Sequence, residues 1–148
     1  RRPSGTKHRP RERRAPAPGA GQVYMATKRD SRGRTLRADK NYKLHVPKGV
    51  PVEQFWALTL YSENTRRPYD NGGKEIRSVN LDSRMKDLKY NADGSIDLHT
   101  GPTAPAGFGA THMKTVGDDG WFVYFRLYAP SQPFFDKSFA LPDFVRMD

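Results

Sequence analysis

The segment at residues 120–130 carries apolar or aromatic side chains on both faces of the β-strand that its alternation predicts. One face would hold Trp121, Val123, Phe125 and Leu127, and the other Phe122, Tyr124, Arg126 and Tyr128. A strand with one face in water would alternate between apolar and polar residues instead. Residues 55–61 have the same two-sided character. We therefore expect two central strands, each covered on both faces.

The rest of the chain from residue 22 onward reads as short strands separated by turn residues, which is typical of an all-β domain. Residues 23–28 and 41–46 are expected to pair as a hairpin with a long tip. Residues 91–94, Asn-Ala-Asp-Gly, form the strongest turn signal, because glycine accepts the positive φ that a tight turn needs. The segments expected to be irregular are 62–90 and 101–109, and residues 134–137 are expected to form one helical turn.

Length and composition indicate one domain. The chain has 148 residues, of which 35% are hydrophobic, and its apolar runs are much shorter than a membrane-spanning helix requires. It has no cysteine, which excludes disulfides and thiol chemistry. We therefore expect a soluble protein that does not span a membrane, with a domain at residues 22–148 and a separate arm at residues 1–21.

The arm at residues 1–21 is strongly basic. It holds seven basic side chains and one acidic one, and so carries +6 of the total charge of +10. It has four prolines and no hydrophobic period, so we expect a flexible segment. Its composition resembles part of an organelle transit segment, and a linker or processed remnant is an equal alternative. Arg9, Arg11, Arg13 and Arg14 are the residues expected to meet an anionic surface, without sequence-specific binding of nucleic acid.

Three stretches in this order and spacing resemble the family called domain of unknown function 1214. They are residues 41–47 running into 55–61, then 91–95, and then 121–130 with 134–137 and 141–143. The resemblance implies a jelly-roll-like antiparallel β-sandwich and implies no reaction. Members are usually the C-terminal half of proteins that begin with domain of unknown function 1254. We expect the basic arm to stand in place of that domain here, and residues 111–114 differ from the Asn-Trp that members often carry.

The sequence shows no spacing typical of a metal site or a catalytic site. The four histidines are His8, His45, His99 and His112, and no two of them have the spacing of a zinc motif. His45 and His99 each fall on the polar side of a strand, so we expect both to face solvent. The aspartates lie mostly in turns, where they cap backbone groups. We therefore expect no metal and no cofactor.

Arg126 is the residue that most strongly suggests a functional site. It lies between Tyr124 and Tyr128 on one face of a central strand, and an unpaired buried charge is costly. One interpretation is a structural arginine held by a carboxylate or by backbone carbonyls. The other is an anion or carbohydrate platform, in which Arg126 donates hydrogen bonds and the rings of Tyr61, Tyr124 and Tyr128 stack. Trp56 and Trp121 are expected to anchor the core.

Two functional hypotheses follow. The favoured one is a non-catalytic binding or assembly module whose aromatic face meets a partner protein or ligand. The alternative is the accessory half of a hydrolase-like enzyme that needs the missing N-terminal partner domain. Another protein subunit is the expected partner in both cases, and the compartment stays open.

Overall fold

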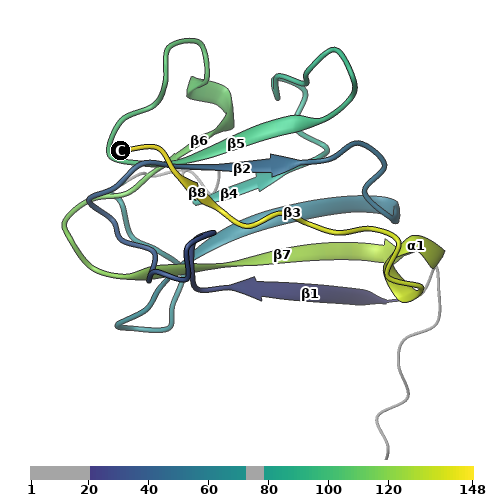
Figure 1. Cartoon of the computed structure of the whole chain (residues 1–148), viewed down its shortest axis with the longest axis horizontal. Helices are drawn as coiled ribbons and strands as arrows, with labels where there is room; N and C mark the ends of the chain where they lie inside the picture. Colours follow the sequence, from purple (N-terminus) through teal and green to yellow (C-terminus); the bar gives the residue numbers. More distant parts are fainter. Residues whose placement is uncertain (1–20, 73–78) are drawn as a thin grey trace, which may run out of the picture.

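The computed structural model describes residues 21–72 and 79–148. They form two four-stranded sheets, ordered β1-β7-β3-β4 and β6-β5-β2-β8, and in Figure 1 β5 and β2 lie above β3, β7 and β1. The strands are β1 (Gln22–Thr27), β2 (Tyr42–Val46), β3 (Val52–Ser62), β4 (Asn80–Asp82), β5 (Ile96–Gly101), β6 (His112–Lys114), β7 (Trp121–Pro130) and β8 (Val145–Arg146). A 3₁₀ turn, η2 (Gly109–Thr111), and a helical turn, α1 (Gln132–Phe135), complete the described elements.

The expectation of an all-β domain is confirmed by these two sheets. Neither sheet closes on itself, and β6 pairs with β5 in parallel while the other strand pairs are antiparallel. The jelly-roll order of strands stays a prediction. The described residues contain no helix that is long and apolar enough to cross a membrane.

The two central strands occur where the sequence placed them. β7 pairs with β1 on one side and with β3 on the other, so both of its edges are hydrogen-bonded. Along β7, Trp121, Val123, Phe125 and Leu127 are buried between the sheets, each with at most 1% of its surface exposed. Trp56 on β3 is buried beside them and stacks on Phe125, which confirms both tryptophans as core residues.

The expected hairpin between residues 23–28 and 41–46 is wrong. β1 pairs with β7, whereas β2 pairs with β5 and β8 in the other sheet. The link at residues 28–41 therefore crosses from one sheet to the other instead of turning back. The alternation of apolar and polar residues along a strand indicates which of its side chains share a face. It does not indicate which other strand pairs with it.

The turn at residues 91–94 is confirmed. Asn91 donates its backbone N–H to the carbonyl of Ser95 at 2.7 Å, and Gly94 has φ of +87°. The expected helical turn begins two residues early, at Gln132. The connection at 62–90 also contains β4, which pairs with β3. The arm lies almost entirely outside the described residues, so its expected flexibility stays a prediction.

Replacing Phe125 by alanine tests the dependence of the fold on β7. Phe125 is fully buried, and we expect Phe125→Ala to lower the free energy of unfolding by about 3–5 kcal/mol, since it leaves a cavity that the core cannot refill. Tyr24 is an aromatic residue of the neighbouring strand with 63% of its surface exposed, and Tyr24→Ala should cost less than about 1 kcal/mol. Urea denaturation measures both, and equal losses would contradict the packing described above.

Candidate binding surface

The outer side of the sheet β1-β7-β3-β4 is lined by aromatic residues. Strand register places Tyr24 opposite Arg126, Phe55 opposite Tyr128, and Tyr61 opposite Phe122. Residues directly opposite each other, and those two apart on one strand, share a face. We call this surface the aromatic face and define it by Tyr24, Phe55, Tyr61, Phe122, Tyr124, Arg126 and Tyr128. It lies on the side of the sheet that does not meet the core.

Arg126 lies among the rings of the aromatic face. Its Nη2 donates a hydrogen bond to the hydroxyl of Tyr61 at 3.0 Å, and its guanidinium carbon is 5.7 Å from the ring centroid of Tyr124. Among the described residues its hydrogen-bond partner is thus a phenol, not the carboxylate or carbonyls that one interpretation expected. Tyrosine neutralises no charge, so Arg126 keeps its positive charge and its other N–H donors on a half-buried surface.

Three of the four residues expected to form a binding cluster contact one another in the structure, namely Tyr61, Tyr124 and Arg126, and Tyr128 does not join them. Tyr61 and Tyr124 are 5.0 Å apart in an edge-to-face contact and both lie within 6.0 Å of the Arg126 guanidinium carbon. Tyr128 instead stacks on Phe55, with ring centroids 4.1 Å apart. Phe55 on β3 lies directly opposite Tyr128, and such cross-strand neighbours are the nearest side chains on one face of a sheet. The ring of Tyr128 therefore packs against Phe55 and not against Arg126.

Basic side chains surround the rings. The guanidinium of Arg84 lies 3.7 Å from the centroid of Phe55 and also forms an ion pair with Asp82. Lys28 and Arg66 lie 5.5 and 5.7 Å from the centroid of Phe122. These contacts are cation–π interactions, so the aromatic face has a cationic rim.

Sequence reasoning missed several of these residues. Tyr24 was placed on a strand, but its face depends on pairing with β7, which lies about a hundred residues further along the chain. Arg66 and Arg84 lie in the irregular segment 62–90, where there is no periodic pattern to interpret. The only available signal was the two-sided aromatic content of β7, which predicted the face but not its neighbours.

The expectation that His99 faces solvent is wrong, since only 5% of its surface is exposed. It lies opposite His112 on β6, and the ring of Phe108, from the loop after β5, covers it at 4.7 Å. Burial lowers the pKa of both histidines, so both are neutral at pH 7. His45 is exposed as expected and its Nδ1 lies 2.7 Å from Asp97. Within residues 21–72 and 79–148, no three His, Asp or Glu side chains are grouped so that they could hold a metal ion.

Comparison with known proteins identifies a family and a fold. The family model for proteins of unknown function named DUF1214 matches residues 21–132. No curated protein sequence matches the chain. The VPA0106 protein of Vibrio parahaemolyticus is similar in structure, with a TM-score of 0.70 at 17% identity over 86% of this chain. An uncharacterised protein of Burkholderia cenocepacia gives a TM-score of 0.61 at 17% identity over 86% of this chain. The match spans only 31% and 30% of those two chains.

The first prediction for this surface concerns the contact between Arg126 and Tyr61. Tyr61→Phe removes only the hydroxyl that accepts from Arg126, and we expect it to lower the free energy of unfolding by about 0.5–1.5 kcal/mol. Arg126→Met should either destabilise the fold or weaken partner binding. Full stability together with full partner binding in Arg126→Met would contradict a role for this residue.

The second prediction concerns the buried histidines. Their folded-state pKa values are lowered, so below about pH 6.5 the unfolded chain binds protons that the folded chain does not. We expect stability to be complete above that pH and to fall as the pH decreases towards the folded-state values. Urea midpoints between pH 7.5 and 5.5 measure the effect. The double variant His99→Gln, His112→Gln should show a flatter profile, and an unchanged slope would count against this assignment.

Proposed function

This chain belongs to the DUF1214 family of proteins of unknown function, and we propose that it is a non-catalytic binding module whose aromatic face docks onto another protein domain. The observation that carries the proposal is the aromatic face itself. Seven neighbouring positions on one side of a sheet hold six aromatic rings and one arginine. Tyr24 has 63% of its surface exposed, Phe122 has 3%, and the other five are half-buried.

The composition of this face is that of an interface. Tyrosine and arginine are enriched where protein surfaces meet, because each joins a large apolar contact to a directed hydrogen-bond donor. The stacked pairs hold their rings in place before any partner arrives, so little side-chain freedom remains to be lost on binding. A contiguous aromatic surface of this kind is uncommon on a protein that acts alone.

The length of the similar structures supports a domain as the partner. This chain spans about a third of each of the two solved chains that it matches, so those proteins contain further polypeptide. The family resemblance makes domain of unknown function 1254 the natural occupant, in the same polypeptide or in a separate one. We further propose that Arg9, Arg11, Arg13 and Arg14 attract an anionic part of the same partner.

The second candidate is the accessory half of a hydrolase-like enzyme. It rests on His45 and Asp97, whose Nδ1 to Oδ1 distance is 2.7 Å. No hydrogen bond within residues 21–72 and 79–148 uses the other ring nitrogen of His45, which is the atom that would act as a general base. Both side chains lie on the sheet opposite the aromatic face, and the nucleophile would come from the partner. Hydrolysis that depends on the complex and is lost in His45→Gln would favour this candidate.

Site-specific photo-crosslinking tests the docking proposal. We would place p-benzoylphenylalanine at position 24 or 128, on the aromatic face, and at position 90 as the control, since Tyr90 is also exposed, at 46%, but lies away from this face. Crosslinks to a single protein domain are expected from positions 24 and 128 and not from position 90. The variant Arg126→Gln should reduce them.

The proposal fails if positions 24 and 128 give no more crosslinks than position 90. It also fails if the isolated chain sediments as a monomer in which Tyr24→Phe leaves the fraction of tyrosine fluorescence that acrylamide quenches unchanged. That result would mean that its own loops already cover the rings.

A further inference from the structure

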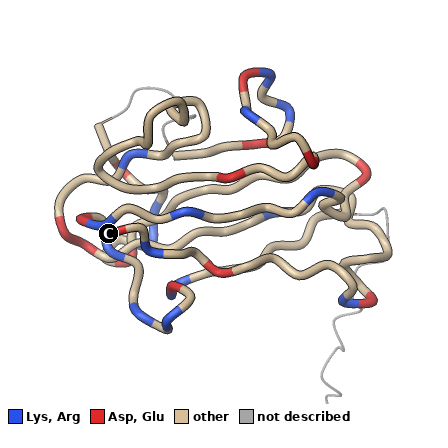
Figure 2. The backbone as a smooth tube through the Cα atoms, turned by 45° about the horizontal axis from the view of Figure 1, so that its top comes forward, with Lys and Arg blue, Asp and Glu red and all other residues tan. Residues whose placement is uncertain are grey.

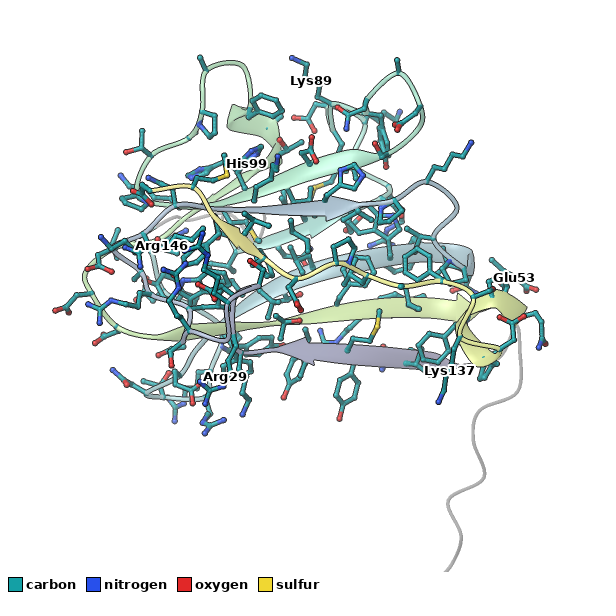
Figure 3. All side chains as sticks on the ribbon, in the orientation of Figure 1. Arg29, Glu53, Lys89, His99, Lys137 and Arg146 are labelled. Atoms are coloured by element: carbon teal, nitrogen blue, oxygen red, sulfur yellow. The ribbon has the colours of Figure 1, made fainter. Side chains whose placement is uncertain are left out.

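The loop after β1 and the last segment of the chain meet at one end of the molecule. Asp30 forms a parallel bridge with Phe144, and Ser31 donates its backbone N–H to the carbonyl of Phe144 at 2.8 Å. Figure 3 shows Arg29 and Arg146 at this end. The bridge sets the register of the two segments, so Arg146 is held near the loop at residues 30–34.

A buried carboxylate shapes this loop. The side chain of Asp30 is fully buried and accepts hydrogen bonds from the backbone N–H groups of Arg32 and Arg34 at 2.9 and 3.0 Å. It also accepts from Nε of Arg34 at 2.8 Å. Burial alone would raise the pKa of Asp30, but the hydrogen bonds from Arg34 and Arg32 outweigh it and the pKa lies below its usual range. Asp30 therefore stays charged, and it holds the guanidinium of Arg34 and the backbone of Arg32.

Three arginines then line one cavity of about 260 Å³, formed by Ser31, Arg32, Arg34, Val145, Arg146, Met147 and Asp148. Nε of Arg34 is occupied by Asp30, and Nε of Arg146 donates to the backbone oxygen of Asp148 at 2.6 Å. Within the described part of the chain, no hydrogen bond uses the terminal amines of Arg34 or Arg146, or the guanidinium of Arg32. These donors are free for a ligand.

The charge at this cavity is positive. The carboxylate of Asp148 is the one acidic side chain in the lining, and it accepts hydrogen bonds from the backbone and side-chain nitrogens of Asn41 at 2.8 and 3.1 Å. In Figure 2 both blue and red segments lie close to the C-terminus. Asp30 lies behind the lining and pairs with Arg34, so three guanidinium groups face two carboxylates, and one net positive charge remains.

We propose that this arginine cavity binds the phosphate group of a small phosphate monoester. A phosphate dianion offers several acceptor oxygens that guanidinium groups bind in pairs, whereas a carboxylate offers only two oxygens and one charge. Val145 and Met147 have 44% and 53% of their surfaces exposed beside the arginines. They provide apolar contact for the organic part of the ester. This site is separate from the aromatic face and does not depend on the function proposed for that face.

Calorimetric titration at constant ionic strength tests the proposal, with phenyl phosphate, inorganic phosphate and benzoate as probes. We expect saturable binding, tightest for phenyl phosphate and weakest for benzoate. Arg32→Gln and Arg146→Gln should each weaken phenyl phosphate about tenfold, the effect of losing one charge-assisted hydrogen bond. Arg67→Gln removes the same charge from an exposed position that does not line the cavity, and should change the affinity less than about twofold.

Circular dichroism shows whether each variant is folded. If Arg146→Gln disturbs β8, Arg146→Lys keeps the charge, loses the planar fork and should still weaken binding. The absence of saturable binding, or an equal loss in Arg67→Gln, would overturn the site. Equal affinity for phenyl phosphate and benzoate would overturn the assignment to a phosphate monoester.

Discussion

The antiparallel pairing of β7 with β3 is the constraint on which the rest of the structure depends. Residues 55–62 of β3 lie opposite residues 121–128 of β7 in unbroken register, after a bulge that follows Val52. One row of their side chains fills the core and the other forms the aromatic face. A shift of one residue in this register would exchange the two rows. Core packing therefore also fixes which rings reach the surface.

This coupling explains what the sequence was able to predict. The segments of β7 and β3 carry apolar side chains on both faces, and that pattern predicts a central strand. The Asp-Gly turn was equally clear, because the glycine there needs a positive φ. Both features depend only on neighbours in the chain. The family match over residues 21–132 includes the segments at 41–47, 55–61, 91–95 and 121–130 on which the resemblance rested, but not those at 134–137 and 141–143.

Most of the failures involve contacts that lie outside the pattern of a single strand. β1 looks like the first half of a hairpin until β7 is available as its partner. His99 lies on the polar side of its strand, yet Phe108 from the following loop covers it, and no pattern within the strand records that loop. Arg84 reaches Phe55 from a segment without periodicity. The arginine cavity, too, depends on a bridge between Asp30 and Phe144 at opposite ends of the described chain.

The pairing of the first strand with the seventh has a consequence for synthesis of the protein. Gln22 pairs with Tyr128, so β1 has no strand partner until more than a hundred further residues have left the ribosome. During that interval an uncharged strand, Gln-Val-Tyr-Met-Ala-Thr, is available to any other extended segment. Long-range pairing of this kind also slows folding, because a large loop must close before the contact forms. The basic residues that precede β1 in the sequence place a cluster of like charges next to this strand, and such charges oppose association between nascent chains.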